Sequence, residues 1–91
     1  MTHTIREKKK LLARVGRIRG QVEALERSLN EETDCARIMH MIAGIRGSVS
    51  GLMAEVVEDH VRCHVAAPSL PARERAERAD ELIEVVRAYL R

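Results

Sequence analysis

Apolar residues recur along the chain in steps of three and four, which is the spacing of a helix that buries one face along its length. A first run predicts a helix over residues 5–29, and a second predicts one over residues 34–64. The apolar positions of the first run are Leu11, Val15, Ile18, Val22, Leu25 and Leu29. Those of the second are Ile38, Ile42, Ile45, Val49, Leu52 and Val56. No segment alternates as a strand does, so the pattern indicates an all-α fold.

Polar residues mark the ends of these helices. Thr4 and Glu7 have the spacing of a capping box, and Asp34 is a good N-cap for the second helix. Pro68 and Pro71 end the second helix, because proline cannot continue one. A turn centred near residue 32 then predicts an antiparallel hairpin in which residue k lies opposite residue 64 minus k, to within about one helical turn.

A shorter third helix is predicted from the apolar residues Leu82, Ile83, Val86 and Leu90, and would cover remaining apolar surface. Three glycines interrupt the middle of the long second helix, where each one lowers helix stability. They are Gly44, Gly47 and Gly51. We interpret this stretch as the place where another helix backbone approaches closely.

The chain of 91 residues is expected to form one domain over residues 1–91. A thin layer of helices this short buries little apolar surface, so association with further copies is expected. No run of about 18 apolar residues could span a bilayer, and residues 1–10 lack the apolar stretch of a secretory signal. Together these features predict a cytoplasmic protein whose two cysteines are reduced thiols rather than a disulfide framework.

Histidines and a cysteine are spaced so that they meet only between two chains. His60 and His64 share one face of the second helix, and the hairpin brings His3 opposite residue 61. Cys35 lies 25 residues before His60, or about 37 Å along one straight helix. A second copy packed antiparallel would place its Cys35 beside these histidines. The sequence therefore predicts a metal site of His3, His60 and His64 from one chain and Cys35 from another.

Each part of this pattern also has a plainer interpretation. Taken alone, a histidine pair on a polar helix end is more often surface decoration, and a lone cysteine is more often an incidental thiol. Residues 39–41, Met-His-Met, resemble a copper box, but consecutive helical positions point about 100° apart, which favours packing. The segment 60–64 lacks the glutamate of a zinc protease helix, and no nucleophile and base pair is evident, so catalysis is not expected.

Positive charge gathers at the start of the chain. Residues 1–20 contain seven basic residues and one acidic residue, a local charge of +6, whereas residues 21–91 sum to −4. Lys10, Arg14 and Arg17 share one helix face that association would repeat by symmetry, as suits the phosphates of duplex DNA. The stripe alone also fits a solvated helix face. The single aromatic residue, Tyr89, argues against single-stranded nucleic acid, and no helix-turn-helix is evident.

Four segments and one cysteine resemble the CsoR/RcnR family of bacterial metal-responsive repressors over nearly the whole chain. The segments are THTIR at residues 2–6, VGRIRGQV at 15–22, IAGIRG at 42–47 and GLMAEV at 51–56, and the cysteine is Cys35. The resemblance implies a tetramer built as a dimer of dimers, whose apo form binds double-stranded operator DNA. In such proteins metal binding weakens DNA binding and turns on an exporter gene.

The likeness is strongest to the nickel- and cobalt-responsive RcnR branch. That branch implies a site for Ni(II) or Co(II), with Zn(II) or copper as further candidates. The ligand pattern of the branch falls on His3, Cys35, His60 and His64. The DNA-binding residues expected from the basic face and the resemblance together are Lys10, Arg14, Arg17 and Arg46.

Departures from the other branches help to choose among them. The copper-sensing branch has a cysteine at the position of His64, although Cys63 here is an extra candidate ligand that would admit copper or zinc. The formaldehyde-responsive branch has a proline at the position of Thr2 and a glutamate at that of His64. If Met1 is removed, the amine of Thr2 becomes a further nitrogen donor. A formaldehyde-responsive repressor and a metal buffer or chaperone with no DNA role are the alternatives.

Overall fold

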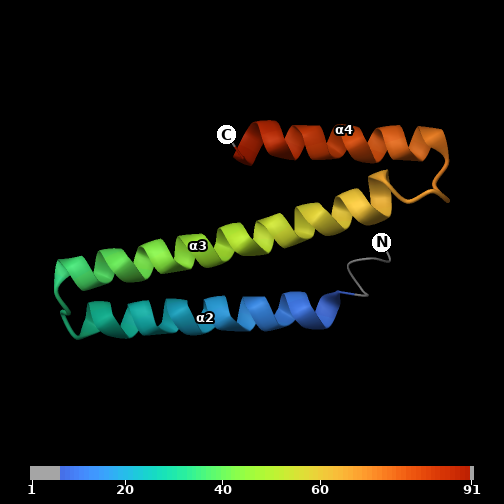
Figure 1. Ribbon diagram of the computed structural model, residues 1–91. Helices are drawn as coiled ribbons and strands as arrows, with labels where there is room; N and C mark the ends of the chain where they lie inside the picture. The colour runs from blue at the N-terminus through green and yellow to red at the C-terminus, as the bar shows by residue number, and fades with distance from the viewer. Residues whose placement is uncertain (1–6, 91) are drawn as a thin grey trace. The chain divides into compact units, whose positions relative to one another are not determined.

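The computed structural model describes residues 7–90, and these residues are helical apart from short connections (Figure 1). Helix α2 spans Lys8–Asn30 and α3 spans Cys35–His60; the π-helix η1, Val61–Val65, continues α3, and α4 spans Ala72–Tyr89. No strand occurs within residues 7–90, which confirms the predicted all-α fold. Contacts divide the chain into two compact units, one of them Arg6–Ala54, while the other includes the chain from Glu55 onward.

The first unit is the predicted helical hairpin, and its turn is set by backbone hydrogen bonds. At the end of α2, the amide of Glu32 donates to the carbonyl of Leu29 and that of Thr33 to the carbonyl of Ser28. This pair of bonds is a Schellman motif, which requires a left-handed residue, and Glu32 has a φ of 55°. The turn therefore lies at the predicted position near residue 32.

Both ends of the hairpin can be compared with the sequence signals. Asp34 Oδ1 accepts a hydrogen bond of 3.1 Å from the amide of Arg37, so the predicted N-cap of α3 is confirmed. Helix α2 begins at Lys8 after Glu7, which makes no side-chain capping bond. Thr4, its predicted partner in a capping box, lies outside the described residues.

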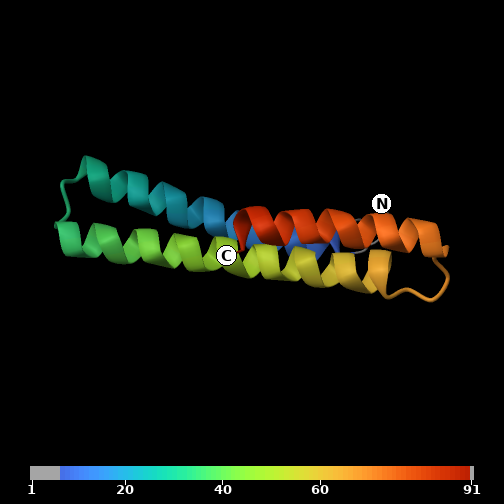
Figure 2. The ribbon, with the colours of Figure 1, turned by 90° about the horizontal axis from the view of Figure 1, so that it is seen from above.

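Helices α2 and α3 run side by side and antiparallel within this hairpin (Figures 1 and 2). A Cβ at Gly51 would lie 3.2 Å from Nη1 of Arg14, and one at Gly44 would lie 3.8 Å from Nε2 of Gln21. The residue numbers in both pairs, 14 with 51 and 21 with 44, add up to 65. The predicted register pairs residues whose numbers add up to 64, so the observed register differs by one residue. The predicted close approach of another backbone is not seen within the described part of one chain, because the neighbours at Gly44 and Gly51 are side-chain ends and a Cβ at Gly47 would meet nothing within 4 Å.

The predicted apolar stripes are only half covered. Of the α3 stripe, Ile38, Ile45 and Leu52 are half-buried, whereas Ile42, Val49 and Val56 are exposed. In the α2 stripe, Leu11, Val15, Ile18 and Leu25 are half-buried, whereas Val22 and Leu29 are exposed. Within residues 7–90 no apolar side chain is fully buried. One chain therefore leaves much of its heptad pattern without a partner, as expected of a protein that associates.

The second unit contains the end of α3, η1 and α4. Helix η1 ends at Val65, before Pro68 as predicted. Arg75 joins the connecting loop to α4, because its Nη2 donates to the carbonyls of Ala67 at 3.0 Å and Leu70 at 3.2 Å. The predicted third helix is confirmed and begins at Ala72. Across the described part of the chain, none of the helices combines the length and apolarity needed to cross a membrane.

The strained turn supplies a first prediction. Glu32→Gly should raise the free energy of unfolding by about 0.5–1 kcal/mol, because glycine adopts a positive φ without the steric cost that glutamate meets. Glu31→Gly is the matched control: Glu31 has a φ of −86°, so glycine there gains no relief and should destabilise the protein. Urea unfolding at one protein concentration measures both. Equal effects of the two variants would contradict the prediction.

Candidate functional site

The two histidines of the predicted metal site lie next to each other at the end of α3. His60 is the last residue of α3 and His64 lies in η1, and both are half-buried. Their ring centroids are 5.3 Å apart and the ring planes are tilted by 41°. Two imidazoles at this separation, held on adjacent turns, can supply two nitrogen ligands to one ion. The predicted sharing of a face by His60 and His64 is therefore present in the structure.

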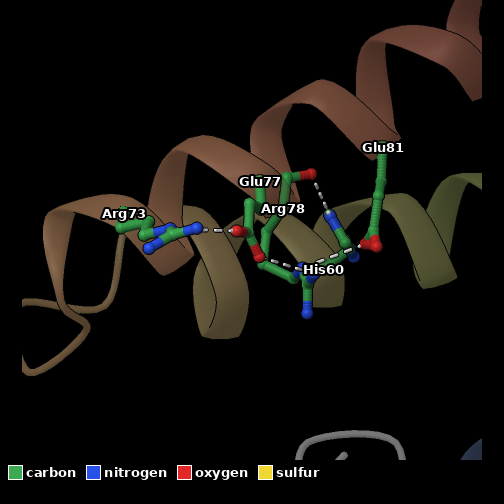
Figure 3. A network of polar contacts seen from close by, with 5 residues as sticks. All are labelled: His60, Arg73, Glu77, Arg78 and Glu81. Carbon is green, nitrogen blue, oxygen red and sulfur yellow. Dashed lines mark hydrogen bonds and ion pairs between the residues drawn. The ribbon is translucent and has the colours of Figure 1, made fainter.

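A backbone carbonyl of α4 fixes the tautomer of His60. Nε2 of His60 lies 2.9 Å from the carbonyl oxygen of Arg78 (Figure 3). A carbonyl oxygen only accepts hydrogen bonds, so Nε2 must carry the proton and donate it. In neutral His60 the lone pair is consequently on Nδ1. Metal-binding histidines are commonly oriented in this way, with the second ring nitrogen bound to a carbonyl or carboxylate.

Charged side chains surround this contact on α4. Nε of Arg78 lies 3.0 Å from Oε1 of Glu81, and its Nη2 lies 3.6 Å from Oε2 of Glu77. Nε of Arg73 lies 3.6 Å from Oε1 of Glu77 (Figure 3). Such partly exposed pairs add little to stability. They do pair the guanidinium beside the histidines with carboxylates, which offsets positive charge where a cation would bind.

Partial burial lowers the pKa of His64 from its ordinary value of 6.5, and the neighbouring charge of His60 lowers it further. Both effects act in the same direction, because burial and a like charge each disfavour the imidazolium. A larger fraction of His64 is therefore neutral near pH 7. The neutral imidazole is the form that binds a metal ion.

The other predicted ligands do not lie beside the histidines in the described part of the chain, or lie outside it, except for Cys63. Cys35 is the first residue of α3 and is exposed. Cys63 lies in η1 and is half-buried. His3 and Thr2 lie outside the described residues. Within residues 7–90, no three side chains of histidine, cysteine, aspartate or glutamate come together to hold an ion. The described part of a single chain thus contributes only the His60 and His64 pair.

Two features of this site carry no recognisable signal in the sequence. The π-helical turn of η1 is closed by a 2.7 Å bond from the amide of Ala66 to the carbonyl of Val61, and such turns are frequent at functional sites. The carbonyl of Arg78 is a second such feature, since any residue could supply it.

The predicted DNA-binding residues all lie in the hairpin unit. On α2, Lys10 and Arg17 are exposed and Arg14 is half-buried, and Arg46 on α3 is exposed. A surface groove is lined by residues of both helices, and the apolar Ile18 and Ala24 lie there beside the polar Arg14, Arg17, Gln21 and Ser48. Gln21 and Ser48 are not among the residues that the sequence predicts to bind DNA. The spacing of Gln21 from Arg14 and Arg17, at seven and four residues, does extend the basic face.

The family model described as metal-sensitive transcriptional repressor matches residues 7–88. The chain belongs to this family. Over all 91 residues and the full length of both chains, it is 48% identical to a protein of Serratia marcescens described as an uncharacterized protein in the bioA 5′ region. It is 45% identical, again over both full lengths, to the transcriptional repressor RcnR of Salmonella paratyphi B.

A solved structure supports the fold of this family member. It is a glutamate-to-histidine variant of the formaldehyde-responsive regulator FrmR from Salmonella enterica serovar Typhimurium. Its TM-score is 0.85 at 45% identity, with 92% of this chain and 94% of that chain covered. The resemblance to the CsoR/RcnR family is thereby confirmed. Membership of a family of transcriptional repressors implies DNA binding and oligomerisation.

A second prediction concerns His64 and pH. Because folding lowers the pKa of His64 below 6.5, the unfolded chain binds this proton more tightly. The stability linked to His64 is present above pH 6.5 and is lost as the pH falls from 6.5 through the folded-state pKa. His64→Gln should therefore flatten the stability profile of the metal-free protein in that window. Urea unfolding at one protein concentration, with the His64 pKa from NMR, measures this; parallel profiles would contradict it.

Proposed function

We propose that this repressor responds to Ni(II) or Co(II), with Zn(II) and copper as competing ions, through a site shared between subunits. One chain would supply His3, His60 and His64, and another would supply Cys35. Cys63 and the amine of Thr2 are the further candidate donors. The observation that carries the proposal is the adjacent pair His60 and His64, with Nε2 of His60 bound to the Arg78 carbonyl. This arrangement leaves Nδ1 of His60 as the ligand nitrogen.

A cross-subunit site follows from where the residues lie on α3. Cys35 and His60 are the first and last of its 26 residues. At about 1.5 Å per residue, one ion cannot bind both within a single straight helix. The exposed residues Ile42, Val49 and Val56 provide an apolar stripe along the same helix, which another chain would cover. An antiparallel partner would bring its Cys35 toward these histidines, and we propose that two such dimers form a tetramer.

The donor set favours borderline metals. Several imidazole nitrogens and one thiolate suit Co(II), Ni(II) and Zn(II), and raw affinity alone would favour copper or zinc. Selection of nickel or cobalt would then depend on coordination number and geometry. Similarity to RcnR supports this choice, because the chain has the histidine at position 64 that the RcnR pattern requires.

The metal-free form would bind double-stranded operator DNA through Lys10, Arg14, Arg17 and Arg46. These residues lie on the hairpin, and an oligomer repeats them by symmetry. Closure of the metal site would pull His3 toward α3 and fix the position of one subunit against another, so that the basic residues no longer match the phosphates. Such coupling is reciprocal, so DNA should weaken metal binding by the same factor, typically about 1–3 kcal/mol. We expect the repressor to act in the cytoplasm and to control a metal exporter gene.

The formaldehyde-responsive alternative is favoured by one observation, the solved structure of a FrmR variant that resembles this chain. The chain has an exposed Cys35 but threonine rather than proline at position 2. Release of DNA by formaldehyde in the absence of metal, and its loss in Cys35→Ala, would establish that alternative. Release by Ni(II) or Co(II) that is lost in His64→Gln supports the metal site.

A third prediction tests the sharing of ligands between chains. Cys35→Ala protomers mixed with His60→Ala, His64→Ala protomers should regenerate some intact sites, because one interface can combine Cys35 of the second type with both histidines of the first. Neither parent should bind Co(II) well. Co(II) absorption after confirmed subunit exchange measures the recovery. Mixed oligomers that bind no more metal than their parents would show that the proposed cross-subunit geometry is wrong.

A fourth prediction tests the DNA surface. Arg14→Ala and Arg17→Ala should each weaken binding to duplex DNA from upstream of the protein's own gene while metal affinity stays constant. Each should also reduce the salt slope of binding by about one unit, since one phosphate contact is lost. Fluorescence anisotropy over a range of salt concentrations measures both quantities. If the double variant binds as the parent does, these arginines are a solvated helix face, as the metal buffer alternative requires.

A further inference from the structure

We infer that Gly51 is a positioning residue for DNA recognition: its missing side chain lets the guanidinium of Arg14 lie on α3 in a fixed place. This inference rests on the proposed phosphate contact of Arg14. It adds a role for a residue of α3 that is not itself expected to touch DNA. The role would account for a glycine in the middle of a 26-residue helix, where glycine lowers helix stability relative to alanine.

The geometry of the hairpin carries the inference. A Cβ at Gly51 would lie 3.2 Å from Nη1 of Arg14, which is closer than an ordinary carbon–nitrogen contact. Arg14 is accordingly half-buried, whereas Lys10 and Arg17 on the same face are exposed. The long side chain of Arg14 reaches from α2 across to the backbone of α3. The glycine therefore marks the place where the tip of this arginine rests.

The two other glycines of α3 show that this contact is particular to Gly51. A Cβ at Gly44 would lie at an ordinary 3.8 Å from Nε2 of Gln21, and one at Gly47 would meet nothing within 4 Å. All three lie inside the same helix, so alanine should raise helix propensity equally at each. Only at Gly51 would the added methyl group displace a charged group. The chain thus contains its own matched controls.

Holding an arginine in place matters for binding a phosphate. A free arginine side chain loses rotamer entropy when it is fixed, and a side chain already held in position loses less on binding. Arg14 also lines the surface groove together with Arg17, Gln21 and Ser48, so its guanidinium lies among other groups able to donate hydrogen bonds. A displacement of a few tenths of an ångström would move the Arg14 guanidinium relative to these groups, and an oligomer would repeat that change in every subunit.

The test compares Gly51→Ala with Gly47→Ala in the metal-free, full-length protein. The probe is a labelled duplex from upstream of the protein's own gene, measured by anisotropy. Gly51→Ala should bind about tenfold more weakly, or about 1.4 kcal/mol, while Gly47→Ala should remain within about twofold of the parent. Both should fold at least as stably as the parent, because alanine raises helix propensity at each position and the group displaced at position 51 is the end of a side chain rather than backbone. Co(II) affinity should be the same in both variants.

A double-mutant cycle shows whether Gly51 acts through Arg14. If it does, adding Gly51→Ala to Arg14→Ala should weaken DNA binding no further. Additive losses, or a Gly51→Ala protein that binds DNA as Gly47→Ala does, would overturn the inference while leaving the Arg14 contact in place. If Arg14→Ala alone leaves DNA affinity unchanged, the proposed DNA surface and this inference both fall.

Discussion

A pair of antiparallel helices can cover only part of the apolar surface that a heptad pattern provides, and this limit governs the whole molecule. Each long helix carries two apolar positions per heptad, and the hairpin shelters them incompletely. On α3, the residues Ile38, Ile45 and Leu52 are half-buried, whereas the intervening Ile42, Val49 and Val56 stay exposed. The exposed apolar residues are suited to association with further copies of the chain. The proposed metal site also requires an oligomer, because Cys35 and His60 lie at opposite ends of α3.

The same sequence pattern explains how much of the fold was predictable. The three helices, the turn near residue 32 and the N-cap at Asp34 follow from short-range rules, and the structure confirms them. The helix ends are less exact, because α2 begins at Lys8 where the prediction began at residue 5, and α3 gives way to η1 after His60. The hairpin register was predicted to within one residue, as the approach of Arg14 to Gly51 shows. Apolar periodicity identified the stripes but not which half of each would be sheltered. That division depends on the facing helix, which a repeat within one segment does not specify.

The metal site was predictable only in part, for a different physical reason. Histidines at positions 60 and 64 have a recognisable spacing, and their rings do lie together. The group that orients His60 is a backbone carbonyl, that of Arg78, and a carbonyl has no signature in a sequence. The π-helical turn of η1 also has no signature in the sequence, because its backbone hydrogen bonds span five residues instead of the four of an α-helix. His3 lies outside the described residues, so its predicted place beside the histidines stays a prediction.

Helix α4 contributes to the site without supplying any of the proposed ligands. Its Arg78 carbonyl accepts a hydrogen bond from Nε2 of His60, and the carboxylates of Glu77 and Glu81 pair with the Arg78 side chain. If an ion draws on Nδ1 of His60, the proton on Nε2 becomes more acidic and its bond to the carbonyl strengthens, since a more polarised donor makes a stronger hydrogen bond. Metal binding at the end of α3 would thus tighten the attachment of α4.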